Sequence, residues 1–320
     1  MIFWQIEGSM ECGVMCMFDA VGFGALNLDK IYRVDKIPGR DEEGFVLDVE
    51  MHPGGSAANT IVGLSRLGLK TSFIGKTGDD EEGKILIDDF RNEGVDTSAI
   101  IRAKGRSGAA MIFVDEGGSR AILVDPGVND TIKLEEVRTS ILKNAGVLHL
   151  TSFICKNGLE SFDSQKSVVK LAKELKFHVT FDPGLIYVEK GFKELEDIIK
   201  TTTVFLPNKS EIELLMNMDY RDGSREIISM GCKIVAVKLG REGCFITDGE
   251  KEYFIDAFDV KPVDTTGAGD AFNAGFIYGF LKGYPLKTCG MLGNFVASKN
   301  IQRVGARAGL PSKDEIEEIL

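Results

Sequence analysis

Residues 264–270, DTTGAGD, combine glycines and a carboxylate in a spacing that suits phosphate chemistry. They follow an extended run and open a helical pattern, so we expect Gly267, Ala268 and Gly269 to form the first turn of a helix. The first turn of a helix has free N–H groups and the positive end of the helix dipole, which together bind anions. Asp270 would lie beside such an anion, where a carboxylate serves as a base that accepts a proton from an attacking hydroxyl.

A second glycine pair, Gly54 and Gly55, precedes a predicted helix that begins near residue 57. Glycines allow a ligand to approach the backbone closely, and the amide of Asn59 offers both a donor and an acceptor. A simple turn with Ser56 as the helix cap accounts for the same residues equally well. These four residues are therefore a candidate ligand-binding turn, with a structural role as the alternative.

Asn208 and Glu211 lie three residues apart at the start of another predicted helix. Their oxygen atoms suit Mg²⁺ carried with its waters by the phosphates of a nucleotide. A capping box, in which the two side chains bond the first turn of the helix, is the favoured alternative when the pair is considered alone.

The elements that would position these residues alternate between strand and helix along most of the chain. Strands are expected at 20–24, 71–74, 147–150, 179–181, 204–206, 234–238 and within 253–263, and helices at 57–67, 81–92, 164–175, 193–199, 209–216 and 225–230. This order predicts an α/β fold: a three-layer, doubly wound, mainly parallel sheet. Polar segments follow five strands: Asn27 with Asp29, Asp182, Asn208 with Glu211, Gly240, and residues 264–270. Ligands bind beyond the carboxyl ends of parallel strands, so these segments are expected to line one crevice.

Two segments interrupt the alternation and predict a small additional β-sheet. Residues 32–52 hold Phe45, Leu47, Val49 and Met51 in strict alternation, and residues 109–124 form a predicted hairpin. Such a sheet would be a lid over the crevice, a dimer surface, or both. Both faces of its strands carry apolar residues, which favours a homodimer formed through the lid.

Composition limits the classes of partner. A net charge of −11 argues against nucleic acid or an anionic membrane surface as the main partner, although it allows a small anionic ligand. No apolar run reaches membrane length, and six scattered cysteines without a C-x-x-C pair suit a reducing compartment. We therefore expect a cytoplasmic protein whose residues 1–16 are an N-terminal extension and whose residues 17–320 form the working domain.

These motifs, in this order, resemble those of the ribokinase-like (PfkB) family of carbohydrate kinases. The resemblance rests on Gly54-Gly55-x-Ala57-x-Asn59, Pro207-Asn208-x-x-Glu211, Lys238-Leu239-Gly240-x-x-Gly243, Gly78-Asp79-x-x-Gly83 and residues 264–272. It covers roughly residues 17–320 and implies a β-sheet lid, with strands from about 29–53 and 107–126, over a three-layer core. It also implies transfer of the γ-phosphate of ATP to a hydroxymethyl group of a small sugar.

The resemblance also implies roles for individual residues. Asp270 would be the base, and the backbone of Gly267, Ala268 and Gly269 the anion hole. The implied sugar ligands are Asn27, Asp29, Gly54, Gly55 and Asn59. Asn208 and Glu211 would organise Mg²⁺ through water, and Lys238, Gly240, Gly243 and Asn294 would line the nucleotide pocket. Asp264, Thr266 and Gly305 match the surroundings of the monovalent-cation site, K⁺, that many members have.

One departure from the family pattern concerns the acceptor. Ribokinases proper tend to have a lysine where this chain has Ser56, so ribose is an open choice beside fructose-like sugars, keto-deoxy sugar acids and nucleosides. A nucleoside kinase on the same fold is the main alternative, with apolar lid residues such as Met111 and Phe113 against the base. A non-catalytic sugar- or nucleotide-binding protein would not need Asp270. An NAD-dependent oxidoreductase would rest only on Gly22-x-Gly24.

Overall fold

The computed structural model describes residues 17–175 and 177–320, so the extension expected over residues 1–16 lies outside the described residues. A nine-stranded sheet runs through the centre in the order β13-β12-β11-β10-β9-β8-β1-β4-β5. Its strands are β1 (Phe18–Phe23), β4 (Thr71–Gly78), β5 (Ile100–Ala103), β8 (Ala145–Thr151), β9 (His178–Asp182), β10 (Val204–Phe205), β11 (Ile234–Lys238), β12 (Cys244–Thr247) and β13 (Glu252–Ile255). Only the β11–β12 and β12–β13 pairs of this sheet are antiparallel.

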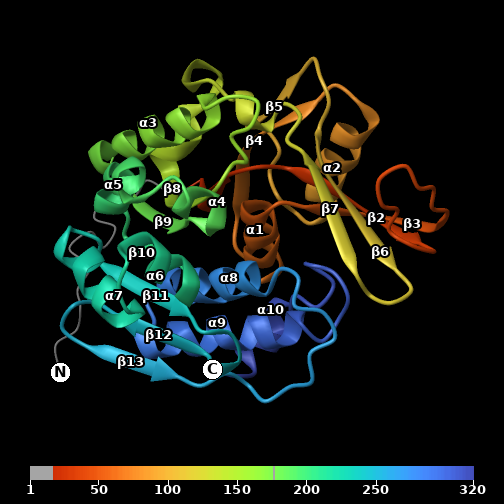
Figure 1. The fold of residues 1–320 in the computed structure, drawn as a ribbon. Coiled ribbons are helices and arrows are strands. Elements are labelled where there is room, and N and C mark those ends of the chain that lie inside the picture. Colours follow the sequence, from red (N-terminus) through yellow and green to blue (C-terminus); the bar gives the residue numbers. More distant parts are fainter. Residues whose placement is uncertain (1–16, 176) are drawn as a thin grey trace.

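Helices cover both faces of this sheet (Figure 1). They are α1 (Ser56–Arg66), α2 (Glu81–Asn92), α3 (Glu160–Leu175), α4 (Gly184–Val188), α5 (Phe192–Thr201), α6 (Lys209–Met216), α7 (Tyr220–Ser229), α8 (Ala268–Leu281), α9 (Leu286–Asn300) and α10 (Lys313–Glu317). One hydrophobic core lies between the sheet and α3, α5, α6 and α7, and the other between the sheet and α1, α2, α8 and α9. The predicted three-layer, doubly wound and mainly parallel fold is confirmed.

The predicted small sheet is also present. It has the order β3-β2-β6-β7, with β2 (Asn27–Val34), β3 (Val46–Gly54), β6 (Gly108–Asp115) and β7 (Arg120–Asp125). These four strands project to one side of the central sheet as a separate layer, which we call the lid sheet (Figure 1). Strand β2 pairs with β3 in the antiparallel and with β6 in the parallel direction.

Asn27 and Asp29 follow β1 as expected, and because the chain enters the lid sheet at once, both residues belong to β2. One expectation about strand ends is wrong. The extended run expected to Val263 ends as a strand at Ile255. Beyond it the amide of Asn294 donates to the carbonyl oxygens of residues 255 and 256, both at 3.0 Å, which occupies the acceptors there.

Candidate active site

The start of α8 is held by a network around the DTTGAGD segment. Gly267 is the N-cap residue and has φ 72°, and a Cβ there would lie 2.8 Å from backbone and side-chain atoms of Ala306. Only glycine fits both constraints. One carboxylate oxygen of Asp264 accepts from the N–H and hydroxyl of Thr266, at 3.0 and 2.7 Å, and the other accepts from the N–H of Gly305 at 2.9 Å. These bonds fix the backbone from which α8 begins.

The backbone N–H groups of this turn differ in availability. Ala268 donates to the carbonyl oxygen of Thr265 at 3.2 Å, so its N–H is already used, contrary to the expected anion hole of three consecutive residues. Within the described residues, the N–H groups of Gly267, Gly269 and Asp270 have no hydrogen-bond partner. Unpaired N–H groups at a helix start attract an anion.

Asp270 lies three residues into this helix start and receives two hydrogen bonds from α1. The hydroxyl of Ser56 donates to Oδ1 at 2.6 Å, and the amide of Asn59 donates to Oδ2 at 2.8 Å. Burial raises the pKa of Asp270 to about 6, although the bonds from Ser56 and Asn59 oppose that rise. A carboxylate with a pKa near 6 is well matched to accepting a proton near neutral pH.

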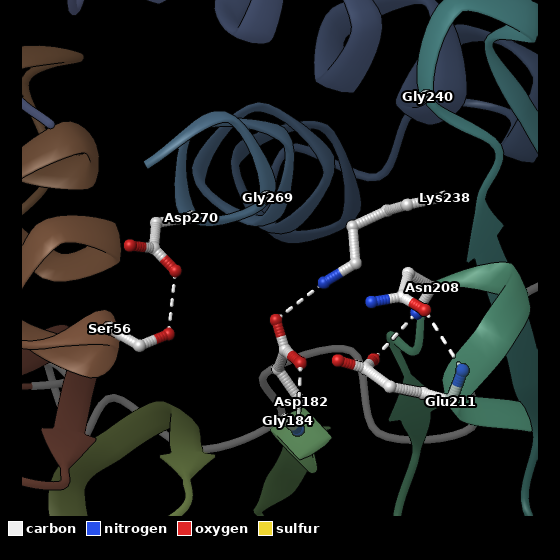
Figure 2. Close-up of a pocket in the computed structure, with 9 residues that line it drawn as sticks. All are labelled: Ser56, Asp182, Gly184, Asn208, Glu211, Lys238, Gly240, Gly269 and Asp270. Carbon is white, nitrogen blue, oxygen red and sulfur yellow. Dashed lines mark hydrogen bonds and ion pairs between the residues drawn. The ribbon is translucent and has the colours of Figure 1, made fainter. Parts of the chain in front are cut away.

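Asp270 and the residues around it line a pocket of about 330 Å³. Figure 2 shows the nine lining residues: Ser56, Asp182, Gly184, Asn208, Glu211, Lys238, Gly240, Gly269 and Asp270. They come from α1, from α8, from the last residues of β9 and β11, and from the segments that follow β9, β10 and β11. The carboxyl ends of these strands therefore meet here as expected. A Cβ at Gly269 would lie 3.5 Å from Nζ of Lys238, an ordinary contact, so the protein alone does not require glycine there. Its small size leaves room in the pocket instead.

A buried ion pair forms one wall of this pocket. Nζ of Lys238 donates to Oδ2 of Asp182 at 2.5 Å, and the amide of Asn273 on α8 donates to the same oxygen at 2.6 Å. Burial alone would raise the pKa of Asp182, but the charge of Lys238 and these two hydrogen bonds outweigh burial and lower it. The lysine therefore places a positive charge in the pocket beside an ionised carboxylate.

Asn208 and Glu211 form the capping box that sequence reasoning favoured as the alternative. Oδ1 of Asn208 accepts from the N–H of Glu211 at 2.9 Å, and Oε2 of Glu211 accepts from the N–H of Asn208 at 2.7 Å. Both side chains nevertheless line the pocket. Burial and the charge of Asp182 raise the pKa of Glu211. Capping uses one oxygen of the carboxylate, and the other is drawn toward the pocket in Figure 2.

The predicted sugar-side residues gather at the base of the lid sheet. Gly54 packs on the carboxylate of Asp29 so closely that a Cβ would lie 2.5 Å from its Oδ2. Gly55 has φ 106° and is the N-cap of α1, a position that sequence reasoning gave to Ser56. Burial raises the pKa of Asp29 to about 6, and the charges of Arg307 and His52 oppose that rise. The side-chain oxygen of Asn27 accepts from the amide of Asn129 at 2.9 Å.

Two residues predicted to line the nucleotide pocket do not line this one. The Asn294 amide bonds backbone carbonyls after β13, as described above. Gly243 has φ 97°, and a Cβ there would lie 2.0 Å from the carbonyl oxygen of Ile255, so its glycine is required for packing. The sequence analysis placed Asp182 at the end of a predicted strand but gave it no role of its own. It did not identify Asn273 or Arg307. No local pattern marks the last two, because their partners lie 91 and 248 residues away.

Metal ligands were predicted near both ends of the site. In the part of the chain that the structure describes, no cluster of three or more His, Cys, Asp or Glu side chains could hold a metal ion by itself. Asp264, Thr266 and Gly305, the predicted surroundings of a monovalent cation, bond one another through N–H and hydroxyl donors. A cation near either end would therefore need further ligands from backbone carbonyls, water or a bound substrate. Separately, the helices of the described residues include none that is both long and apolar enough to cross a membrane.

Comparisons with known proteins agree on one family. Residues 17–313 match the family model described as pfkB family carbohydrate kinase. The chain is 58% identical over 250 residues to an uncharacterized sugar kinase of Archaeoglobus fulgidus, covering 78% of this chain and 98% of that protein. It is 30% identical to an ATP-dependent ribose-1-phosphate kinase of Halopiger xanaduensis, covering 95% and 98% of the two chains. Among solved structures, ribokinase from Thermotoga maritima superposes with a TM-score of 0.82 at 26% identity, covering 94% and 98%.

Proposed function

The chain belongs to the pfkB family of carbohydrate kinases, phosphotransferases that act on a sugar hydroxyl, and we propose that it transfers the γ-phosphate of ATP to a hydroxymethyl group of a small ribose- or fructose-like sugar. The observation that carries this proposal is the position of Asp270. Its carboxylate has a raised pKa, receives bonds from Ser56 and Asn59, and belongs to a helix start whose N–H groups at 267, 269 and 270 have no partner within residues 17–175 and 177–320. A non-catalytic binding protein has no need of such a carboxylate.

In the proposed reaction Asp270 accepts the proton of the sugar hydroxyl as its oxygen attacks the γ-phosphorus. A new O–P bond forms, the bond between the γ-phosphorus and the β–γ bridging oxygen breaks, and ADP leaves with that oxygen. The N–H groups of Gly267, Gly269 and Asp270 stabilise the negative charge that develops on the transferred group. Lys238, whose Nζ lies close to Gly269, supplies a positive charge in the same pocket.

Mg²⁺ fits the other end of the pocket. Glu211 keeps one carboxylate oxygen clear of its capping bond, and Asn208 lies beside it, so both would hold the ion through its water shell. When bound, Mg²⁺ neutralises charge on the phosphates of the nucleotide. We also propose that K⁺ binds near Asp264, Thr266 and Gly305, since the bonds among these residues shape the turn that precedes α8.

The acceptor is proposed from the sugar-side residues and the relatives. Asp29 and Asn59 offer a carboxylate and an amide to hydroxyl groups, and Gly54 and Gly55 bring the backbone close to them. The relative from Halopiger xanaduensis is named for ribose 1-phosphate, which makes that sugar phosphate a candidate beside ribose and fructose. We further propose a cytoplasmic location, because four of the cysteines, Cys155, Cys232, Cys244 and Cys289, are free thiols.

A coupled ADP-release assay tests the function directly. The acceptors are ribose, ribose 1-phosphate, fructose, a keto-deoxy sugar acid, adenosine and cytidine, each with Mg-ATP in K⁺ or Na⁺ buffer. Turnover on a sugar that falls by about 10²–10⁴-fold in Asp270→Asn, with ATP affinity within a few-fold of wild type, is the expected result. Near-normal turnover of that variant would remove Asp270 as the base. Turnover restricted to adenosine or cytidine would reassign the protein as a nucleoside kinase.

The lid sheet supports a second part of the proposal, a homodimer. Residues directly opposite on paired strands share a face of a sheet. Lid-sheet register therefore places Met51, Met111 and Leu123 on one face, together with Val49 and Phe113, whereas Asp29 lies on the other. The face away from Asp29 also carries Lys30, which pairs with Glu82 of α2, but it is otherwise largely apolar. Of its residues, Val49, Met51 and Leu123 are 41%, 54% and 60% exposed on the single chain. We propose that this face pairs with the same face of a second copy.

A further inference from the structure

A buried arginine lies behind the proposed base and connects it to α2. Arg307, in the segment after α9, is only 8% exposed. Its Nε donates to the side-chain oxygen of Asn59 at 2.7 Å, and its Nη1 donates to Asp89 on α2 at 2.5 Å. Asn59 in turn donates to Asp270 at 2.8 Å. Four side chains from three helices and the segment after α9 thus form one chain of hydrogen bonds that ends at the proposed base.

The donors and acceptors in this chain allow only one orientation of the Asn59 amide. Arginine has donors and no acceptor, and an ionised carboxylate has acceptors and no donor. The amide oxygen must therefore point to Arg307, and the amide nitrogen to Asp270. A rotated amide would place its NH₂ against the guanidinium and its oxygen against the carboxylate, so both bonds would be lost and two like dipoles would face each other.

We propose that Arg307 is a positioning residue for phosphoryl transfer, which holds the Asn59 amide in the orientation that donates to Asp270 and is itself held by Asp89. This inference rests on the proposed function of Asp270 as the base. Arg307 acts through Asn59: its Nη2 atom has no partner among the residues that the structure describes and is shielded from solvent, and neither Arg307 nor Asp89 lines the pocket.

A purely structural role accounts less well for this arginine. Arg66 already joins α1 to α2 through two bonds to Glu93, at 2.6 and 2.8 Å, and also holds the carbonyl oxygen of Arg307 at 2.6 Å. A second guanidinium at the same junction costs desolvation, and within the described residues Nη2 of Arg307 has no partner that offsets this cost. Burial accordingly lowers the pKa of Arg307 and raises that of Asp89. Orientation of Asn59 is a function that Arg66 does not provide.

The test follows the titration of the Asp270 carboxyl, which needs no acceptor sugar. Protein labelled with [4-¹³C]aspartate is titrated by NMR, and the Asp270 resonance is assigned as the one missing from Asp270→Asn. In Arg307→Met the amide is free to rotate, and loss of its bond should raise the midpoint of Asp270 by about one unit. The matched control is Arg66→Met, which breaks the guanidinium–carboxylate pair of α1 with Glu93 and the bond to the carbonyl oxygen of Arg307. It keeps the side-chain bonds of Arg307 to Asn59 and Asp89, so the midpoint should not move.

Other charged groups are accounted for in the same experiment. Asp182, Lys238 and Glu211, which also interact with Asp270, are unchanged in every variant, and Asp29, which faces Arg307, is assigned separately with Asp29→Asn. Arg307→Lys keeps the positive charge but cannot bond Asn59 and Asp89 in the same fork geometry. We expect the titration midpoint of Asp270 in Arg307→Lys to remain above that of wild type. A wild-type midpoint in Arg307→Lys would assign the effect to charge alone and overturn the proposal.

A midpoint in Arg307→Met equal to that of wild type, with thermal stability reduced as in Arg66→Met, would also overturn it. If Arg307→Met does not fold, Asp89→Asn releases Arg307 from α2 and should raise the midpoint in the same direction by a smaller amount. An unchanged midpoint of Asp270 in Asp89→Asn would count against the proposal. The base assignment is tested apart from this, since turnover retained by Asp270→Asn would refute the proposed function whatever the titration shows.

Discussion

The amide of Asn59 and the carboxylate of Asp270 meet at 2.8 Å although 211 residues separate them in the chain. The contact exists because α1 and α8 pack very closely. A Cβ at Gly63 of α1 would lie only 2.7 Å from the Cβ of Ala274 in α8, a separation that real side chains do not reach. The proposed base is therefore positioned by the fit of two helices rather than by a loop.

Gly63→Ala should separate these helices and weaken the bond between Asn59 and Asp270. We expect a loss of about 1–3 kcal/mol in the free energy of unfolding and a fall in kcat larger than any change in the KM for ATP. Gly223→Ala in α7 is the control, because a Cβ there meets its nearest atoms at 3.3–3.4 Å and α7 contributes no residue to the pocket. Urea unfolding and steady-state kinetics measure both effects. Equal kcat values in the two variants would contradict the role of helix packing.

The pH dependence of turnover should follow Asp270. A base must be deprotonated, so kcat at saturating substrate should fall as the pH drops through about 6. Ser56→Ala removes a hydrogen bond that lowers the pKa of Asp270, and the acidic limb should therefore move to higher pH. The pKa of Asp29 is also raised to about 6, so Asp29→Asn is used to distinguish the two carboxylates. This variant should change the KM for the sugar and leave the acidic limb of the kcat profile where it is in wild type. An acidic limb unmoved in Ser56→Ala would exclude Asp270 as its source.

The raised pKa of Asp270 also affects stability, because turnover needs the ionised carboxylate whereas the fold favours the protonated one. The folded-state pKa of Asp270 is raised from 3.8 to about 6, so its protonated form favours folding below pH 3.8, and this contribution is lost as the pH rises through 6. Asp270→Asn should consequently have a higher Tm than wild type at pH 7.5 and a similar Tm at pH 3.8. Thermal unfolding at the two pH values measures this difference. A lower Tm at pH 7.5 would mean that the ionised carboxylate stabilises the fold.

The pocket wall makes a separate prediction about stability. Lys238→Met would leave Asp182 buried without its positive partner, and breaking a buried pair in this way typically costs about 3–5 kcal/mol. The double variant Lys238→Met with Asp182→Asn removes both charges and should recover most of that loss. Urea unfolding of the single and double variants completes the comparison. A double variant no more stable than Lys238→Met would show that packing of the lysine stem, not its charge, is what matters.

The sequence predicted the elements whose signals are local. Residues 264–270 contain the turn, the helix start and the carboxylate together, and alternating strands and helices define the layers without reference to distant contacts. The same is true of the lid sheet, whose strands show period-two alternation. Fold and proposed base could therefore be read from short segments.

The remainder of the site depends on contacts between distant segments, which no short pattern contains. Asn273 is one more polar residue of a helix until the fold places it 2.6 Å from Asp182. Arg307 follows Val304-Gly305-Ala306 in a segment without a helix or strand pattern, yet it is buried behind Asn59. Asn294 illustrates the converse, because an amide suited to a ligand can equally well bind backbone carbonyls, and here it does.

The lid sheet provides the last prediction, a dimer that depends on one face of one strand. Leu123 and Ile122 are neighbours on β7 and are 60% and 55% exposed, but they lie on opposite faces of the lid sheet. Leu123 shares the apolar face with Met51 and Met111, and Ile122 shares the face that carries Asp29. A charge at Leu123 would be buried without a partner in the proposed dimer, whereas a charge at Ile122 would not.

Light scattering after size-exclusion chromatography at micromolar concentration measures the mass of each protein. We expect wild type and Ile122→Glu to have the mass of a dimer and Leu123→Glu that of a monomer of 35.0 kDa. Ile122→Glu should instead raise the KM for the acceptor sugar, because that face is on the side of Asp29. A monomeric wild type would refute the dimer. Dissociation by Ile122→Glu but not by Leu123→Glu would place the interface on the opposite face of the lid sheet.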